Sequence, residues 1–492
     1  MHKQDELAIG LDLGTSGVKA VLLSAGGDLL AEAIAPLELQ RPQPLWSEQH
    51  PADWLAAVDQ VMRALRDAAG AERWARVVAL GTAGQMHGAV LLGADGAVLR
   101  PAMLWNDGRS QAQCEELERR EPASRRITAN RAMAGFTAPK LLWVAEHEPK
   151  LFARVAKVLL PKDWLVLQLT ATMSSDCSDA AGTLWLDVGR RRWSEAMLAA
   201  TGLRLHHMPE LHEGCDAVAP LLPHWCAAWG LPAGVRVAAG AGDNAAGAVG
   251  VGVTRPGDGF VSLGTSGVVF VATADASANP ERGVHTFCHA LPDTWHQMAV
   301  MLSASSSLAW LGGITGASPS ALLANLPVGQ LREQAPLFLP YLSGERTPHA
   351  DPAATASLLG ITAATTRDDL AYAVIEGVVF SFADGLAALI EAGARPSRLL
   401  AIGGGARSDT WLQLMADTLA LRIDRPARAE VGPALGAARL ALLSVGLPRA
   451  AVLQPPALAR SFEPQINAAS AAALQRRLQR YRAAYAPTRA LT

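Results

Sequence analysis

The sequence is poor in cysteine. It holds five cysteines in 492 residues, and none of them belongs to a CxxC pair. The odd number argues against a disulfide framework, and the lack of pairs argues against a thiolate zinc site. We therefore expect buried, reduced thiols at Cys114, Cys177, Cys215, Cys226 and Cys288.

A strong excess of one charge and a long apolar run are also missing. The formal net charge is −2 and the pI is about 6.6, so composition favours neither nucleic acid nor an anionic membrane as a partner. No stretch of about 18 uninterrupted apolar residues occurs, and the first ten residues carry acids where a secretion signal needs a basic and then an apolar segment. These features predict a cytoplasmic protein.

The common nucleotide-binding fingerprints are absent as well. No GxxxxGK[ST] loop occurs, and the glycine-rich segment LLAIGGGARSD is not a GxGxxG motif. The P-loop and Rossmann interpretations therefore lose their main support. His206 and His207 lack HExxH spacing, so we interpret them as surface or loop residues.

One hexapeptide, LGTSGV, occurs twice, at residues 13–18 and 263–268, each time after an apolar, strand-like segment. Each copy predicts a strand, a tight glycine turn and a second strand, and the duplication implies two related halves. A chain of 492 residues is long enough for two domains with a cleft between them. We predict a mixed α/β fold with an N-terminal lobe over residues 1–250 and a C-terminal lobe over 251–492.

Helical spacing of apolar residues marks several other segments. It predicts helices after Pro51, from Asp369 to about Ala392, after Asp409 and from about Pro433. The segment beyond about residue 460 is rich in Ala and Arg, which predicts a terminal surface helix without a chemical role.

The repeated turns suit an anion. Each directs several backbone N–H groups at one point, and Thr15 and Ser16 add hydroxyl donors to the first. The residue before the hexapeptide is Asp12 in the first copy and Ser262 in the second. A carboxylate beside phosphates is a suitable partner for hydrated Mg²⁺; the alternative is that Asp12 only caps its own turn.

Asp243 ends the apolar, strand-like segment VRVAAGAG and precedes small residues that permit close backbone approach. A carboxylate in that position can accept the proton of a hydroxyl that attacks a phosphate, which is the help such a nucleophile lacks in water. The alternative is a helix N-cap, a more frequent role for an Asp before a helix.

Two further segments follow predicted strands. Gly403, Gly404 and Gly405 offer flat backbone that admits a planar base and its ribose, or that forms only a helix-entry turn. Met86 and His87 lie on a loop that could reach the cleft, although a single histidine in an apolar neighbourhood is more often a buried core residue.

Two longer segments carry a resemblance to a known family. Residues 135–147, GFTAPKLLWVAEH, and residues 356–376, ASLLGITAATTRDDLAYAVIE, are similar to the two signatures of the FGGY family of carbohydrate kinases. The resemblance extends from about residue 7 to residue 445. It implies the duplicated actin-like ATPase fold, which is ribonuclease H-like, with ATP and Mg²⁺ as cofactors.

The resemblance also implies a role for each candidate residue. Asp243 corresponds to the general base, and Asp12 to the acid that organises Mg²⁺, through water, and the phosphate. The residues that correspond to sugar contacts are Met86, His87, Asp243 and Asn244. The residues that correspond to nucleotide contacts are Thr15, Gly264, Thr265, Gly404, Gly405 and Ala406.

Shorter segments narrow the implied substrate. GQMHGA, LLPKDWL, SSDCSDAAGTLWLDV and LPYLSGERTPH resemble the xylulose-phosphorylating branch of the family more than its glycerol branch. We therefore expect phosphorylation of D-xylulose by ATP, with neither nucleic acid nor membrane as a partner and a homodimer as the assembly to test. The alternatives are a kinase for another pentulose or a polyol, a non-catalytic actin-like ATPase and a sugar-responsive regulator.

Overall fold

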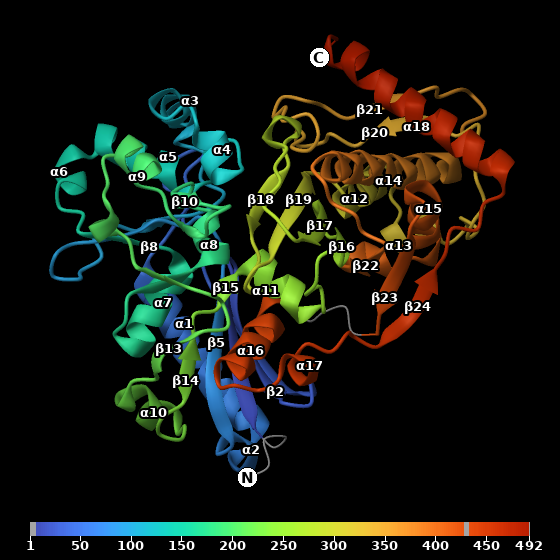
Figure 1. Cartoon of the computed structure of the whole chain (residues 1–492). Coiled ribbons are helices and arrows are strands. Elements are labelled where there is room, and N and C mark those ends of the chain that lie inside the picture. The colour runs from blue at the N-terminus through green and yellow to red at the C-terminus, as the bar shows by residue number, and fades with distance from the viewer. Residues whose placement is uncertain (1–5, 428–431, 492) are drawn as a thin grey trace.

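The computed structural model describes residues 6–427 and 432–491, which form two lobes, each built on a seven-stranded sheet (Figure 1). The first sheet contains β1 (Leu7–Leu13), β2 (Gly17–Ser24), β3 (Leu29–Pro36), β5 (Val77–Gly84), β13 (Ala217–Pro220), β14 (Arg236–Ala238) and β15 (Ala241–Gly242). The second contains β16 (Gly259–Leu263), β17 (Gly267–Thr273), β18 (His285–Cys288), β19 (Trp295–Met301), β22 (Arg398–Ile402), β23 (Arg422–Pro426) and β24 (Leu458–Phe462).

The two sheets repeat one topology. The first has the order β13-β14-β5-β1-β2-β3, with β15 also paired to β5, and the second has the order β24-β23-β22-β16-β17-β19, with β18 beyond β19. In both, the strand that enters the LGTSGV turn pairs antiparallel with the strand that leaves it and parallel with the next central strand. The duplication predicted from the hexapeptide is therefore confirmed.

Within the described residues, ten shorter strands form five two-stranded sheets outside these two. Their bounds are β4 (Glu48–Gln49) with β7 (Ala102–Met103), β6 (Val90–Leu92) with β8 (Lys157–Leu159), β9 (Ser174–Asp176) with β12 (Glu210–His212), β10 (Leu186–Asp187) with β11 (Arg192–Trp193), and β20 (Leu337–Leu339) with β21 (Ser357–Leu359).

Helices pack on both sheets. Those that precede the second sheet in the chain are α1 (Pro51–Ala69), α2 (Ala71–Trp74), α3 (Gln111–Arg120), α4 (Ser124–Thr128), α5 (Thr137–His147), α6 (Pro149–Phe152), α7 (Pro161–Thr170), α8 (Cys177–Ala181), α9 (Glu195–Ala200), α10 (Pro223–Trp229) and α11 (Asp243–Gly250). The others are α12 (Ser305–Thr315), α13 (Pro319–Leu323), α14 (Arg367–Glu391), α15 (Asp409–Leu419), α16 (Pro433–Ser444), α17 (Arg449–Val452) and α18 (Ala468–Arg489). The helices expected after Pro51, Asp369, Asp409 and Pro433 are therefore present.

The sequence of α1 shows why these segments are helical. Pro51 occupies the first turn, where its fixed φ suits a helix and its missing N–H costs nothing. Trp54, Val58, Val61 and Leu65 then recur on one face and are fully buried, as a helical period requires of an amphipathic segment.

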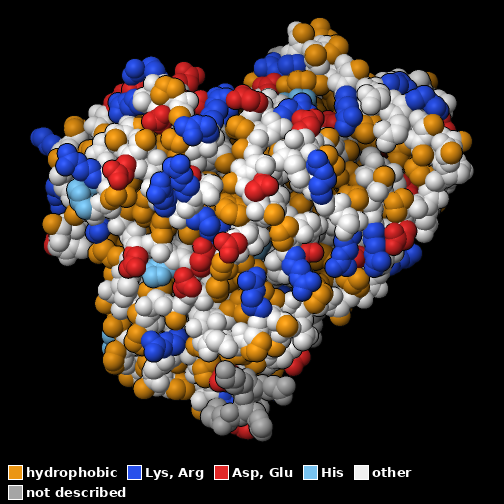
Figure 2. All heavy atoms as spheres, viewed as in Figure 1, with side chains coloured by type: hydrophobic (Ala, Val, Ile, Leu, Met, Phe, Trp, Pro, Cys, Tyr) orange, Lys and Arg blue, Asp and Glu red, His pale blue; other side chains and the backbone are white. Residues whose placement is uncertain are grey.

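Helix α14 is the only described helix long and apolar enough to span a membrane, and 89% of its most apolar stretch is buried inside the protein. It lies under α18 in the C-terminal lobe (Figure 1). Burial by its own lobe explains the apolar sequence of α14. On the face shown in Figure 2, Lys and Arg side chains are interspersed with Asp and Glu rather than gathered into one field.

Helix α16 crosses between the halves of the chain. It follows the second sheet in sequence but packs against β1 and β5 of the first sheet and against α11, and Figure 1 shows it among the N-terminal strands. The contact is backbone to backbone, because a Cβ at Gly10 would lie 1.9 Å from the carbonyl oxygen of Ala434, and one at Gly81 would lie 2.0 Å from that of Ala437. By its contacts, α16 belongs to the N-terminal lobe although it lies after residue 250. The boundary between the lobes at residues 250 and 251 stays a prediction.

The lobes also share part of their hydrophobic core. One buried cluster combines residues of the first half, such as Phe136 and Ala180, with Phe270, Phe287 and Met298 of the second. Strand β18 contacts α8 within this cluster.

Four of the five cysteines are buried and Cys215 is half-buried.

Candidate active site

Three parallel strands bring the predicted acids to one edge of the first sheet. Asp12 on β1 is in register with Ala83 on β5, which is in register with Ala241 on β15. Neighbouring strands lie about 4.8 Å apart, so Asp12 is two strands away from the segment that ends at Asp243. The carboxyl ends of parallel strands are the usual place for a ligand in such sheets.

One carboxylate oxygen of Asp12 lacks a polar partner. Its Oδ1 is buried and has no hydrogen-bond partner within residues 6–427 and 432–491. Burial and, to a smaller extent, the negative charge of Asp243 raise the pKa of Asp12 to about 7, while Lys19 acts in the opposite direction. An oxygen without a partner does not support the alternative that Asp12 only caps its own turn.

Asp243 is the first residue of α11, and Gly242 occupies the N-cap position. Its Oδ1 accepts hydrogen bonds from the backbone N of Asn244 at 2.7 Å and from Asn244 Nδ2 at 2.9 Å. Burial raises the pKa of Asp243 to about 6, and the two bonds from Asn244 limit the rise. One oxygen is thus fixed, and no hydrogen bond to Oδ2 is found in the described part of the chain.

Met86 and His87 follow β5 and lie beside Asp243. A Cβ at Gly242 would stand 2.9 Å from Met86 Cγ, and a Cβ at Gly182 would stand 2.6 Å from His87 Nδ1. A side chain at position 242 would therefore overlap Met86, and one at position 182 would overlap His87, which favours glycine at both positions. The structure brings Asp12, Met86, His87, Asp243 and Asn244 together at one edge of the sheet.

His87 is held in one orientation and one charge state. Its backbone has a positive φ of 70°, and its carbonyl oxygen accepts from Lys140 Nζ at 2.9 Å and from Thr137 Oγ1 at 3.1 Å. Burial lowers the pKa of His87 to about 3, with a smaller opposite effect from Gly182. Because the carbonyl of Gly182, 2.7 Å from Nδ1, only accepts, Nδ1 carries the proton and Nε2 is an acceptor.

The first LGTSGV turn is tied to the same loop. Thr15 Oγ1 donates to Gln85 Oε1 at 2.9 Å and accepts from Trp105 Nε1 at 2.9 Å, while the Thr15 carbonyl accepts from Gln49 Nε2 at 2.8 Å. The hydroxyl of Thr15 is therefore engaged within the lobe. The indole of Trp105 is 45% exposed beside the turn.

The second LGTSGV turn is anchored on the start of α12. The carbonyl of Gly264 accepts from the N–H of Ser305 at 2.9 Å, and that of Thr265 accepts from the N–H of Ala304 at 2.9 Å. These bonds use the carbonyl groups of the turn, so its N–H groups are the donors that a phosphate could meet.

The glycine run after β22 packs on the second turn. Gly403 has a φ of 87°, and a Cβ there would lie 2.8 Å from the carbonyl carbon of Leu263, so only glycine fits. Gly404 is exposed and has open space beside it, and Gly405 is half-buried. Ala406 is 1% exposed, and its N–H and carbonyl groups bond to Gly403 and Arg425, so Gly404 and Gly405 offer the accessible surface of this run.

Sequence reasoning missed a buried cluster of charges behind Asp243. Lys162 Nζ lies 2.8 Å from Asp163 Oδ1 and 3.1 Å from Asp176 Oδ1. Both carboxylate oxygens of Asp179 are buried without a hydrogen-bond partner among the described residues. Burial raises the pKa of Asp179 well above its usual value; the charge of Lys162 lowers it, and the charges of neighbouring acids, Asp243 among them, add to the rise.

This cluster supports the site through α8. Asp176 accepts from the N–H of Ser178 at 2.8 Å and so caps α8, and Ser178 Oγ accepts from the N–H of Gly242 at 3.2 Å. Gly182, directly after α8, holds His87. The segments LLPKDWL and SSDCSDAAGTLWLDV contain these residues, but the burial that defines their role is visible only in the fold.

A divalent metal fits this edge of the sheet in one way. Within the described residues no group of three or more His, Cys, Asp and Glu side chains could hold a metal ion by itself. Mg²⁺ commonly binds through one or two carboxylates together with substrate phosphates and water. The unpartnered Oδ1 of Asp12 is suited to that arrangement.

Comparisons with known proteins agree with this geometry. Residues 7–250 match the N-terminal domain and residues 259–445 match the C-terminal domain of the FGGY family of carbohydrate kinases. The chain belongs to this family. It is therefore an ATP-dependent sugar kinase.

Individual relatives extend the match over the whole chain. A xylulose kinase of Escherichia coli is 48% identical over 97% of this chain and 98% of its own length. One of Klebsiella pneumoniae is 49% identical over 93% of this chain and 94% of its own.

Solved structures show the same fold. The crystal structure of a xyloylose kinase from Brucella ovis is 48% identical, covers 99% of this chain and 100% of its own, and has a TM-score of 0.95. A glycerol kinase of Plasmodium falciparum with ADP is 18% identical, covers 98% of each chain and has a TM-score of 0.88, a likeness of fold. The expected actin-like ATPase fold is confirmed.

Proposed function

We propose that this kinase transfers the terminal phosphoryl group of ATP to the C5 hydroxyl of D-xylulose, giving D-xylulose 5-phosphate and ADP in D-xylose catabolism. Two relatives that cover nearly the whole chain at 48% and 49% identity are named xylulose kinases. The observation that carries the chemistry is the carboxylate of Asp243, with one oxygen held by Asn244 and its pKa raised to about 6.

In this proposal, Asp243 Oδ2 accepts the proton of the C5 hydroxyl as its oxygen bonds to the γ-phosphorus and the bond to the β,γ-bridging oxygen breaks. A base whose pKa lies near neutral pH is both ionised and basic enough for that transfer. His87 Nε2 accepts a hydrogen bond from another sugar hydroxyl, and the side chain of Met86 packs against the sugar. Asn244 keeps the carboxylate of Asp243 in one orientation.

The remaining site residues would hold the nucleotide. The turns that contain Thr15, Gly264 and Thr265 present backbone N–H groups to the phosphates. Gly404 and Gly405 lie against the adenosine, and Ala406 is buried directly after them. Bound Mg²⁺ would neutralise charge on the phosphates, and Asp12 would hold it through water. We also propose a cytoplasmic location, and a homodimer stays a prediction.

Replacement of Asp243 by Asn tests this function. Asn keeps the volume and an acceptor for Asn244 but cannot take a proton, so the turnover number should fall by at least about 100-fold while ATP affinity and the unfolding temperature stay close to the parent values. Coupled detection of ADP measures the rate. The control is Asp67→Asn, at an exposed carboxylate on α1, which should keep the parent rate; a near-normal rate for Asp243→Asn would remove Asp243 from this role.

A panel of sugars separates the alternatives. D-xylulose should give the highest kcat/KM among pentuloses and polyols. A higher value for another pentulose or a polyol would change the assigned substrate. ADP release that no sugar stimulates would indicate a non-catalytic actin-like ATPase instead.

A further inference from the structure

The segment LPYLSGERTPH has no role in the site described so far, and the structure holds it firmly. It lies between β20 and β21 and contacts β19: the N–H of Thr347 donates to the carbonyl of Val300 at 3.0 Å, and the N–H of Val300 donates to Thr347 Oγ1 at 3.1 Å. On the other side of Arg346, Glu345 Oε1 accepts from the N–H of Leu302 at 3.0 Å. Arg346 therefore projects from a fixed backbone position.

In the described part of the chain, the guanidinium of Arg346 has no hydrogen-bond or ion-pair partner. Oε1 of Glu345, its neighbour, accepts from the backbone N–H groups of Leu302 and Arg346. Burial lowers the pKa of Arg346, and the charge of Glu345 opposes this without a hydrogen bond or ion pair. No hydrogen bond or ion pair of the Arg346 side chain is found among residues 6–427 and 432–491, although the residue is half-buried. None of its side-chain nitrogens is among the fully buried, unpartnered atoms, so the N–H donors stay accessible and could bind a ligand that only accepts hydrogen bonds.

A row of aromatic rings connects the surroundings of Arg346 to the loop that carries Met86 and His87. The Arg346 carbonyl would stand 2.9 Å from a Cβ at Gly283, two residues before His285. The ring of His285 lies 5.8 Å from that of Phe136, which lies 4.6 Å from that of His87. Arg346 comes from the C-terminal lobe and His87 from the N-terminal lobe, so the row crosses between them.

The positive charge of Arg346 affects the pKa of two histidines in this row of rings. Its positive charge lowers the pKa of both His87 and His285, in addition to the larger effect of burial. Arg346 is not among the causes of the other two shifts. The pKa of Asp12 responds to burial and to the charges of Asp243 and Lys19, and that of Asp243 to burial and the hydrogen bonds from Asn244. These effects agree with the geometry of the ring row, which leads from the backbone of Arg346 to His87.

We propose that Arg346 binds the acceptor sugar at the end remote from the phosphorylated hydroxyl and donates hydrogen bonds to its ketone oxygen. This inference rests on the proposed function, which places the C5 hydroxyl at Asp243. A ketone oxygen only accepts and a guanidinium only donates, whereas the neutral Nε2 of His87 is an acceptor suited to the adjacent hydroxyl. Arg346 and His87 together recognise the ketose end of the sugar.

A consequence is that the sugar contacts both lobes. Its hydroxyls face His87 and Asp243 of the N-terminal lobe, and its ketone faces Arg346 of the C-terminal lobe. Bound sugar then stabilises the arrangement in which the lobes are close, which excludes water from the reacting phosphate.

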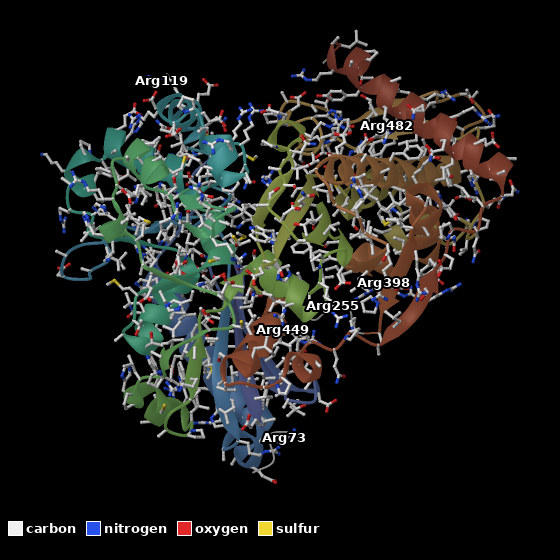
Figure 3. The ribbon with its side chains drawn as sticks, in the orientation of Figure 1. Arg73, Arg119, Arg255, Arg398, Arg449 and Arg482 are labelled. Atoms are coloured by element: carbon white, nitrogen blue, oxygen red, sulfur yellow. The ribbon has the colours of Figure 1, made fainter. Side chains whose placement is uncertain are left out.

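The test is a comparison of a ketose with its reduced forms in Arg346→Gln. A hydrogen bond from a charged group contributes enough for an expected loss of about 10- to 100-fold in kcat/KM for D-xylulose, mostly through KM. The inhibition constants of xylitol and D-arabinitol, which have a hydroxyl in place of the ketone, should change by less than about threefold. Arg73→Gln, at the exposed α2 position labelled in Figure 3, is the matched control and should change neither quantity.

Arg346→Lys is the second variant if Arg346→Gln lowers the unfolding temperature. It keeps the charge but loses the paired donors, so it should show an intermediate loss for D-xylulose. Equal losses for the ketose and the polyols, or an unchanged KM for D-xylulose, would overturn the inference. A parent enzyme that forms no ADP in response to D-xylulose would instead overturn the proposed function.

Discussion

Two carboxylates with raised pKa values share one edge of the N-terminal sheet. The causes of the two pKa shifts differ. Asp12 has a buried oxygen without a partner, and the charge of Asp243 raises its pKa, whereas Asp243 is buried but accepts two hydrogen bonds from Asn244. The hydrogen bonds make Asp243 the more acidic of the two. This order suits a division of labour in which Asp243 exchanges a proton and Asp12 binds a cation.

The pKa values predict an acid limb in the rate profile. A carboxylate acts as a base only when ionised, so activity is lost as the pH falls through the raised values, about 6 for Asp243 and about 7 for Asp12. We expect kcat/KM at saturating Mg-ATP to rise between about pH 5.5 and 7.5, whereas a carboxylate with an ordinary pKa near 4 would give a flat profile there. A rate measured from pH 5 to 8.5 checks this, and a flat profile down to pH 5 would contradict it.

At the scale of elements, the site depends on helices that touch the sheet without side chains in between. Helix α16 approaches β1 and β5 at Gly10 and Gly81, and Gly436 meets α11, where a Cβ would lie 1.8 Å from the carbonyl oxygen of Ala246. Since Asp12 lies on β1 and Asp243 begins α11, α16 positions both elements that carry the acids.

Gly81→Ala should therefore destabilise the protein. The new methyl group would overlap the carbonyl of Ala437, which is part of a helix and cannot move alone, so we expect a loss of at least about 2 kcal/mol in the free energy of unfolding. Urea unfolding at equilibrium measures it.

Gly313→Ala is the matched control for that experiment. Gly313 lies in α12, is exposed and has nothing within 4 Å of an added Cβ. Alanine there should stabilise the protein by about 0.5–1 kcal/mol. A loss for Gly81→Ala no larger than about 0.5 kcal/mol would show that α16 does not pack so closely.

At the scale of the whole molecule, the C-terminal helix α18 connects the core of the C-terminal lobe to the segment that carries Arg346. On the buried face of α18, the hydroxyl of Tyr481 lies 3.0 Å from that of Tyr341, and Arg489 forms an ion pair with Asp351 at 2.6 Å. Figure 3 shows Arg482 on the same helix, over the C-terminal lobe, and it pairs with Asp384 of α14 at 2.6 Å. The terminal helix expected from sequence is present, and it holds the loop at both ends.

Arg477 is the central contact of this helix. It forms bonds of 2.7 Å and 2.5 Å with the two oxygens of Glu376 on α14 and also donates to backbone carbonyls of residues 333, 335 and 336. Arg477→Met leaves a buried, unpaired carboxylate, so we expect a loss of about 3–5 kcal/mol in the free energy of unfolding. Chemical unfolding of the single variant and of Arg477→Met with Glu376→Gln measures this, since the second change should restore part of the loss; an additive further loss would contradict the account.

Much of the fold and the candidate site could be predicted because the signals are local. An apolar strand, a glycine turn and a second strand are consecutive in the chain, so both LGTSGV hairpins are found where the sequence places them. Asp12, His87 and Asp243 each follow or end such a strand, and the carboxyl ends of parallel strands meet at one edge. Local pattern therefore determined the duplication and the candidate acids.

Only the tertiary structure decided what surrounds them. Three features depend on segments that only the fold brings together. They are the packing of α16 on the first sheet, the burial of Asp179 near Lys162 and the lack of a protein partner for the Arg346 guanidinium in the described part of the chain. Such contacts depend on how much water is removed from each group, and burial is a property of the packed chain rather than of any segment. The sequence by itself determined which residues could act, and packing decided their charge states and neighbours.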